Sequence, residues 1–149
     1  MNRFAWLALA ALLLAAGPAF SQIRIENAWT RATPPGAKIA AGYMTIRNDS
    51  DAADRLVSAT SPAAAKVAPH VTTEEGGISR MRAVEGYDIP AHGAFELEPS
   101  GAHLMLMDLK APLEAGEKVP LVLRFRRAGE VKVELEVRPL GASRHGHGH

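Results

Sequence analysis

The sequence of 149 residues contains no cysteine. No disulfide can therefore hold the fold together, and its stability must come from burying apolar side chains. Neither a blue-copper site nor a thiolate zinc site can form, because both use cysteine sulfur. A lipid anchor attached through cysteine is excluded for the same reason. Any metal chemistry must run mainly through histidine and methionine.

The chain also lacks an excess of charge of either sign, since 17 Lys and Arg stand against 16 Asp and Glu. A nearly neutral chain has no electrostatic footprint for DNA or RNA, so no nucleic-acid partner is expected. The sequence further lacks a phosphate-binding loop, a Ser/His/Asp arrangement and carboxylates paired by helix or strand spacing. These absences argue against an enzyme.

A long apolar run occurs at the N-terminus, where residues 4–16 are apolar throughout and follow Arg3. A Gly-Pro pair ends the run, and small side chains stand at positions −3 and −1 of a cleavage point after Ser21. This layout predicts a signal peptide over residues 1–21. The run is shorter than the roughly 20 residues that span a bilayer. We therefore expect the mature chain to be exported to the periplasm without a membrane span.

The rest of the sequence shows the period of two that is typical of half-buried strands. Apolar residues alternate with charged ones over residues 131–137, and turn signals such as Gly76-Gly77 separate the short segments. Strands are predicted from residue 23 on and over residues 40–47, 55–60, 64–73, 78–84, 94–98, 102–107, 121–125 and 131–137. We predict one all-β domain, a sandwich or barrel, over residues 22–140, with a flexible His-rich tail over residues 141–149.

Four residues carry the metal hypothesis: ten residues separate His70 from Met81, twenty-one separate Met81 from His103, and one separates His103 from Met105. Two imidazoles and two thioethers form a soft, neutral ligand set that suits Cu(I). His103 and Met105 are two apart on a predicted strand, so they share a face. A four-residue hairpin loop over residues 74–77 would place His70 directly opposite Met81.

Other methionines and histidines have simpler interpretations. A single Met on a strand usually fills a gap in the core, and we assign Met44 that role. Met107 shares a face with His103 and Met105, which makes it a second contact or a substitute ligand. His92 lies in a predicted surface loop. Pro69 lacks a ladder donor and predicts that the site lies near the rim of the sheet.

The C-terminus ends in alternating histidine and glycine, with His145, His147 and His149. A flexible chain of this kind offers a second, weaker site for Cu(II) or Ni(II). The alternative is a solvated tail without a function, or the remnant of a cloning tag.

With these residues in hand, the chain resembles the PCu(A)C family of periplasmic copper chaperones. The family motif H-x10-M-x21-H-x-M is matched at every interval by His70, Met81, His103 and Met105. The resemblance covers residues 25–137. Further matching segments are Asn27-Ala28-Trp29, Arg31, Pro34-Pro35-Gly36, Ala41-Gly42-Tyr43, Leu97-Glu98-Pro99 and residues 101–106.

The resemblance implies a cupredoxin-like Greek-key β-sandwich or barrel with an exposed Cu(I) site. It also implies copper delivery to the CuA centre of cytochrome c oxidase. The expected partners are then the copper-site subunit of the oxidase or its thiol-containing assembly factors. Many members carry additional methionines in the hairpin after the first histidine, but residues 71–80 contain none. Auxiliary thioether capture in that hairpin is therefore in doubt.

Two other functions fit parts of the same sequence. A copper buffer or resistance protein would need the same four ligands and would hand its metal to no dedicated partner. A metal-free β-sandwich that binds a protein partner would bind no Cu(I) beyond what the tail takes up. Residue patterns alone do not separate these alternatives from a chaperone.

Overall fold

The computed structural model describes residues 22–141, and the regular elements among them are ten β-strands. The strands are β1 (Ile23–Arg31), β2 (Ile39–Asn48), β3 (Asp54–Thr60), β4 (Ala64–Glu75), β5 (Ile78–Ala83), β6 (Tyr87–Ile89), β7 (Gly93–Leu97), β8 (Ala102–Leu109), β9 (Lys118–Phe125) and β10 (Gly129–Arg138). The predicted signal peptide and the tail histidines His145, His147 and His149 lie outside the described residues.

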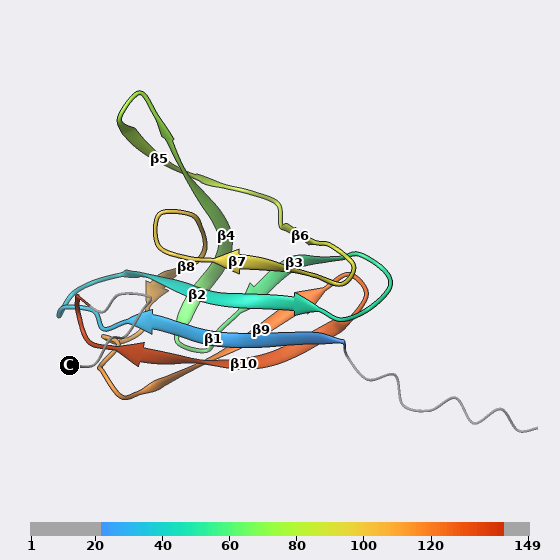
Figure 1. The fold of residues 1–149 in the computed structure, drawn as a ribbon. Coiled ribbons are helices and arrows are strands. Elements are labelled where there is room, and N and C mark those ends of the chain that lie inside the picture. The colour runs from blue at the N-terminus through green and yellow to red at the C-terminus, as the bar shows by residue number, and fades with distance from the viewer. Residues whose placement is uncertain (1–21, 142–149) are drawn as a thin grey trace, which may run out of the picture.

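The strands form one sheet that closes on itself (Figure 1). Going round the barrel, β4 pairs with β8, β8 with β2, β2 with β1, β1 with β10, β10 with β9, β9 with β3, and β3 again with β4. Neighbours such as β4 and β8 are far apart in sequence, and β1 runs parallel to β10. The prediction of an all-β barrel is confirmed, and its crossing connections are of the Greek-key kind rather than a simple meander.

The alternation read from the sequence builds the core. On β9, Leu121 and Leu123 are almost completely buried, while the intervening Val122 is partly exposed. Leu123 pairs with Val131 and Leu121 with Val133 of β10, so their apolar side chains face the same interior. The connection between these strands is residues 126–128, which is shorter than the 126–130 that the predicted strand ends imply, because β10 already begins at Gly129. This interior stabilises the barrel without any disulfide.

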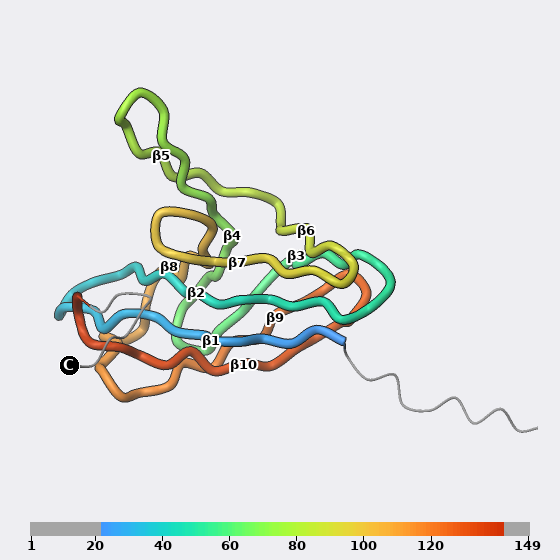
Figure 2. Tube along the Cα trace, viewed as in Figure 1, coloured from blue at the N-terminus to red at the C-terminus, as the bar shows by residue number. Residues whose placement is uncertain are grey.

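The hairpin of β4 and β5 projects from the barrel (Figure 2). Its turn is two residues long, because Gly76 and Gly77 both adopt the left-handed region with φ of 58° and 80°, and Glu75 pairs directly with Ile78. The predicted four-residue loop is therefore wrong. The pairing shifts by two residues, and an even shift leaves every side chain on its original face.

The return from this hairpin to the barrel contains β6, a strand of three residues that the sequence did not predict. The Val84 amide donates to the Pro69 carbonyl at 3.0 Å. Gly86 follows, and a Cβ atom there would lie 2.3 Å from the Leu56 carbonyl oxygen, so only glycine fits against β3. The base of the hairpin is thus fixed to the barrel while its tip is exposed. Within residues 22–141, no helix is long and apolar enough to span a membrane.

Candidate metal centre

The predicted ligands come from three neighbouring strands, in the order β5, β4, β8. His70 on β4 pairs with His103 on β8, and two residues away Met105 pairs with Ala68. His70 also pairs with Ala83 of β5. Because paired residues share a face and the period is two, the two histidines and Met105 lie on the same face of the sheet.

Met81 lies opposite Thr72, not opposite His70 as the sequence analysis predicted. The reason is the shorter glycine turn. On β5, Met81 is two residues from Ala83, the partner of His70, and on β4 its own partner Thr72 is two residues from His70. Met81 is therefore a diagonal neighbour of His70 on the shared face. Diagonal neighbours are roughly 7–8 Å apart, within reach of long side chains. Met81 is 56% exposed, which leaves its thioether accessible near the rim.

The two imidazoles face one another across the strands. Their ring centroids are 5.8 Å apart and their planes differ by 17°. His103 is buried at 4% exposure, whereas His70 is half-buried. Because the lone pair of an imidazole nitrogen lies in the ring plane, two nearly parallel rings on paired strands can bind one ion at their edges.

Backbone carbonyls fix the orientation of both rings. His70 Nδ1 lies 3.1 Å from the carbonyl oxygen of Ala68, and His103 Nδ1 lies 3.2 Å from that of Gly101. A carbonyl only accepts, so each Nδ1 carries the proton and each Nε2 carries the lone pair. This second contact fixes the tautomer of a metal-binding histidine.

The Nε2 atom of His103 is buried and has no hydrogen-bond partner within the described part of the chain. An unpaired buried nitrogen lone pair is costly, and buried polar atoms are usually satisfied. Burial lowers the pKa of the His103 imidazole, with a smaller contribution in the same direction from His70 and an opposing one from the Gly101 carbonyl. Burial thus favours the neutral ring, which is the form that binds a metal.

Met105 is 8% exposed and occupies the middle of β8. Its cross-strand neighbours on both sides are alanines, Ala68 on β4 and Ala41 on β2. Because alanine side chains are small, neither cross-strand neighbour fills the space next to the Met105 sulfur. Leu104 and Leu106 point to the opposite face and are completely buried, so β8 is buried on both sides.

Met107 continues the same face of β8 and is half-buried, between Lys66 of β4 and Ile39 of β2. Its role as a second contact or substitute ligand stays a prediction. Within residues 22–141, no three side chains of the His, Asp and Glu types gather to hold a metal. The donors available at this face are therefore the two imidazoles and the thioethers.

Sequence reasoning did not identify Tyr87 as part of the site. Its hydroxyl accepts the His70 amide at 3.0 Å and lies 2.7 Å from the His70 carbonyl and 2.6 Å from the His103 carbonyl. Burial raises the pKa of Tyr87 to about 12, against the effect of both carbonyl hydrogen bonds. No pattern in the sequence signals this contact, because its partners are backbone atoms that only the fold brings together.

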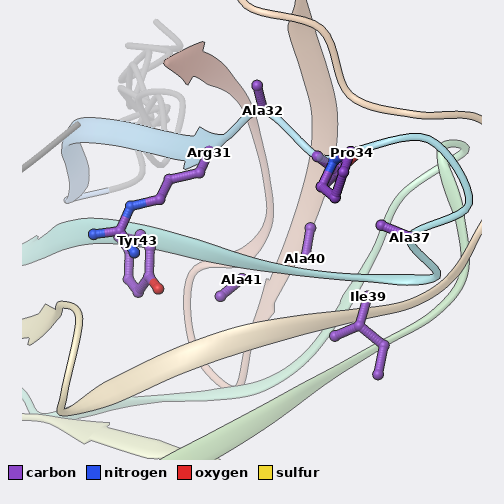
Figure 3. Close-up of a pocket in the computed structure, with 9 residues that line it drawn as sticks. Arg31, Ala32, Pro34, Ala37, Ile39, Ala40, Ala41 and Tyr43 are labelled. Atoms are coloured by element: carbon purple, nitrogen blue, oxygen red, sulfur yellow. The ribbon is translucent and has the colours of Figure 1, made fainter. Parts of the chain in front are cut away.

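Figure 3 shows a hollow beside β2, lined among others by Ala40, Ala41 and Tyr43. Its volume is about 230 Å³, and β2 is the strand that pairs with β8 next to Met105. Its lining is mostly apolar, and Arg31 supplies the charge. Ile39 and Ala41 belong to its wall and pair with Met107 and Met105. The Arg31 guanidinium lies over the rings of Trp29 and Tyr43, at 5.4 and 6.0 Å from their centroids. An accessible apolar surface thus borders the predicted ligands.

Comparison with known proteins places the chain in a family. The LpqE-like family profile matches residues 23–137. The chain belongs to the LpqE-like family. A relative from Leifsonia xyli subsp. xyli, Lxx21020, which is named as a lipoprotein, is 36% identical over 117 residues, covering 78% of this chain and 69% of the relative. This LpqE-like chain has no cysteine to carry a lipid.

Solved structures similar to this LpqE-like protein include PCuAC domains. The copper-bound PCuAC domain from PmoF2 matches with a TM-score of 0.68 and 27% sequence identity, over 79% of this chain and 93% of that domain. The solution structure of CuI-DR1885 from Deinococcus radiodurans matches with a TM-score of 0.64 and 35% identity, over 83% of each chain. These neighbours support the resemblance to the PCu(A)C family, while the four-residue ligand motif stays a prediction.

The ring tautomers give a direct check of this geometry. In the metal-free protein, His70 and His103 are expected to carry their proton on Nδ1. His92 is the internal control, because its Nε2 lies 2.6 Å from the Asp51 carboxylate and must be the protonated nitrogen. Long-range 1H–15N NMR at about pH 8, where free imidazole is neutral, distinguishes the two forms. A proton on Nε2 of His103 would contradict the assignment.

Proposed function

We propose that this protein is a periplasmic copper chaperone that carries Cu(I) on His70, Met81, His103 and Met105. The observation that carries the proposal is the buried, unpartnered Nε2 of His103, whose ring is held parallel to that of His70 next to Met105. The copper-bound PCuAC domain of PmoF2 and CuI-DR1885 support it by similarity.

The donor set explains why reduced copper is the favoured cargo. Imidazole and thioether are neutral and the thioether is soft, so they stabilise Cu(I) better than harder divalent ions. No carboxylate shares the site among the described residues, which removes the donors that Mg²⁺ and Ca²⁺ require. A ligand set without thiolate binds Cu(I) less tightly than a thiolate acceptor does. Copper can then pass downhill to such an acceptor by ligand exchange.

The proposed recipient is the CuA centre of cytochrome c oxidase, reached through its copper-site subunit or its thiol-containing assembly factors. Transfer needs a ligand that a partner can approach, and the exposed thioether of Met81 at the rim meets that need. Export to the periplasm, through the signal peptide proposed for residues 1–21, would bring the protein to the compartment where the recipient acts.

Replacing individual ligands tests the site. His103→Ala should lower the Cu(I) affinity by about 100-fold or more, and Met81→Leu by about tenfold, because each removes a donor atom. Met44→Leu is the matched control, since Met44 is a methionine buried in the core at 2% exposure and should leave the affinity unchanged. Competition with a chromogenic Cu(I) chelator measures all three. Wild-type affinity in His103→Ala would refute the proposed site.

Deletion of the gene tests delivery against buffering. A dedicated chaperone predicts that the deletion strain loses cytochrome c oxidase activity and regains it with added copper or with the wild-type gene. Complementation with His103→Ala should fail. A copper buffer predicts instead normal oxidase activity, together with growth that becomes sensitive to excess copper. Oxidase assays and copper-dose growth curves on the same strains separate the two functions.

The tail is proposed as a second, weaker site, with His145, His147 and His149 binding Cu(II). Truncation after Ser143 should remove one class of Cu(II) binding in a calorimetric titration. The truncated protein should keep its Cu(I) affinity, because the four proposed ligands precede the cut. Identical Cu(II) titrations of the full and truncated chains would show that the tail binds no metal.

A further inference from the structure

The hydroxyl of Tyr87 contacts the backbone at both paired histidines. It accepts the amide of His70 at 3.0 Å and reaches the carbonyl oxygens of His70 and His103 at 2.7 and 2.6 Å. A phenol has one proton to donate, so the two carbonyls share it. One side-chain oxygen therefore links β4 to β8 at the position where their two imidazoles lie side by side.

The Tyr87 ring is itself firmly placed. It is 3% exposed, and it stacks on Phe95 with ring centroids 4.7 Å apart and planes 20° apart. Its backbone pairs with Leu56 of β3, the strand that closes the barrel by pairing with β4. The oxygen is thus held by the core and by β3, and it transmits the rigidity of the barrel to the two histidine strands.

Tyr87 also ends the segment that returns from the hairpin carrying Met81. From the end of β5, the chain passes through Val84, whose amide bonds to Pro69, and then through Gly86, which lies tightly against the Leu56 carbonyl. Tyr87 follows at once. The residue that links the two histidine strands therefore also fixes the base of the strand with the third proposed ligand.

We infer that Tyr87 is a positioning residue of the copper site, whose hydroxyl sets the separation of His70 and His103 before copper arrives. The inference rests on the proposed function and deepens it. Residues that orient metal ligands without touching the metal commonly control affinity, because they remove the cost of arranging the ligands during binding. Tyr87 acts on the backbone of the ligands, whereas the carbonyls of Ala68 and Gly101 act on their rings.

The test is Tyr87→Phe, which keeps the buried ring and removes only the hydroxyl. The Cu(I) affinity should fall by about tenfold, mainly through faster copper dissociation. The matched control is Ser61→Ala. Ser61 is also buried and its hydroxyl also donates to a backbone carbonyl, that of Pro120 at 2.6 Å, but it lies outside the three ligand strands. It should lose stability in thermal unfolding while keeping the wild-type Cu(I) affinity.

Two further measurements separate positioning from general stability. X-ray absorption of copper-loaded Tyr87→Phe should show fewer or more disordered nitrogen neighbours than the wild type, and Ser61→Ala should match the wild type. In the metal-free wild type, the His70 amide should exchange its hydrogen slowly, because Tyr87 accepts it. This second measurement needs no variant and holds even if Tyr87→Phe folds poorly.

The outcomes are distinct. Wild-type affinity and dissociation rate in Tyr87→Phe would overturn the inference, as would equal losses of affinity in Tyr87→Phe and Ser61→Ala. Unprotected exchange of the His70 amide in the wild type would overturn it as well. Failure of the wild type to bind Cu(I) would instead overturn the proposed function.

Discussion

The candidate site depends on the buried Nε2 of His103, which has no hydrogen-bond partner among residues 22–141. Leaving a buried nitrogen without a partner costs on the order of 1–3 kcal/mol, and a folded chain rarely tolerates it. Here the neighbouring contacts maintain it, because the Gly101 carbonyl holds the proton on the other nitrogen. The lone pair of this nitrogen is thus kept out of water, and the proposed binding of Cu(I) there would relieve a cost already present in the fold.

The proposed ligands of the site are electrically neutral. Burial favours the uncharged form of the His103 ring, and the thioethers of Met81 and Met105 carry no charge at any pH. No carboxylate joins them in the described chain. A neutral pocket gives a monovalent cation little electrostatic attraction, so selectivity rests on the match between soft donors and a soft ion. On the proposed ligand set, the affinity for Cu(I) would therefore be moderate, which suits the proposed role of a carrier.

Much of the fold and of the candidate site could be predicted from the sequence, and each prediction that was wrong or missing has a physical cause. The period of two on β8 correctly separated the face of His103 and Met105 from the core face. The predicted hairpin register was wrong because Gly76 and Gly77 both adopt positive φ and close a two-residue turn, where the prediction assumed a loop of four residues. The even shift nevertheless kept Met81 on the correct face. Tyr87 was beyond sequence reasoning, since its partners are main-chain atoms that any residue type would supply.

The projecting hairpin can open locally without global unfolding of the barrel. β5 pairs with β4 alone, and all six of its residues are exposed, so its opening disturbs little of the barrel interior. Such a segment can detach with a small free energy while the global unfolding free energy stays unchanged. Met81 lies on β5 of this hairpin, whereas His103 and Met105 lie on β8 in the closed barrel. On the proposed ligand set, the thioether of Met81 would leave a bound ion first, while the barrel that holds the other ligands stays folded.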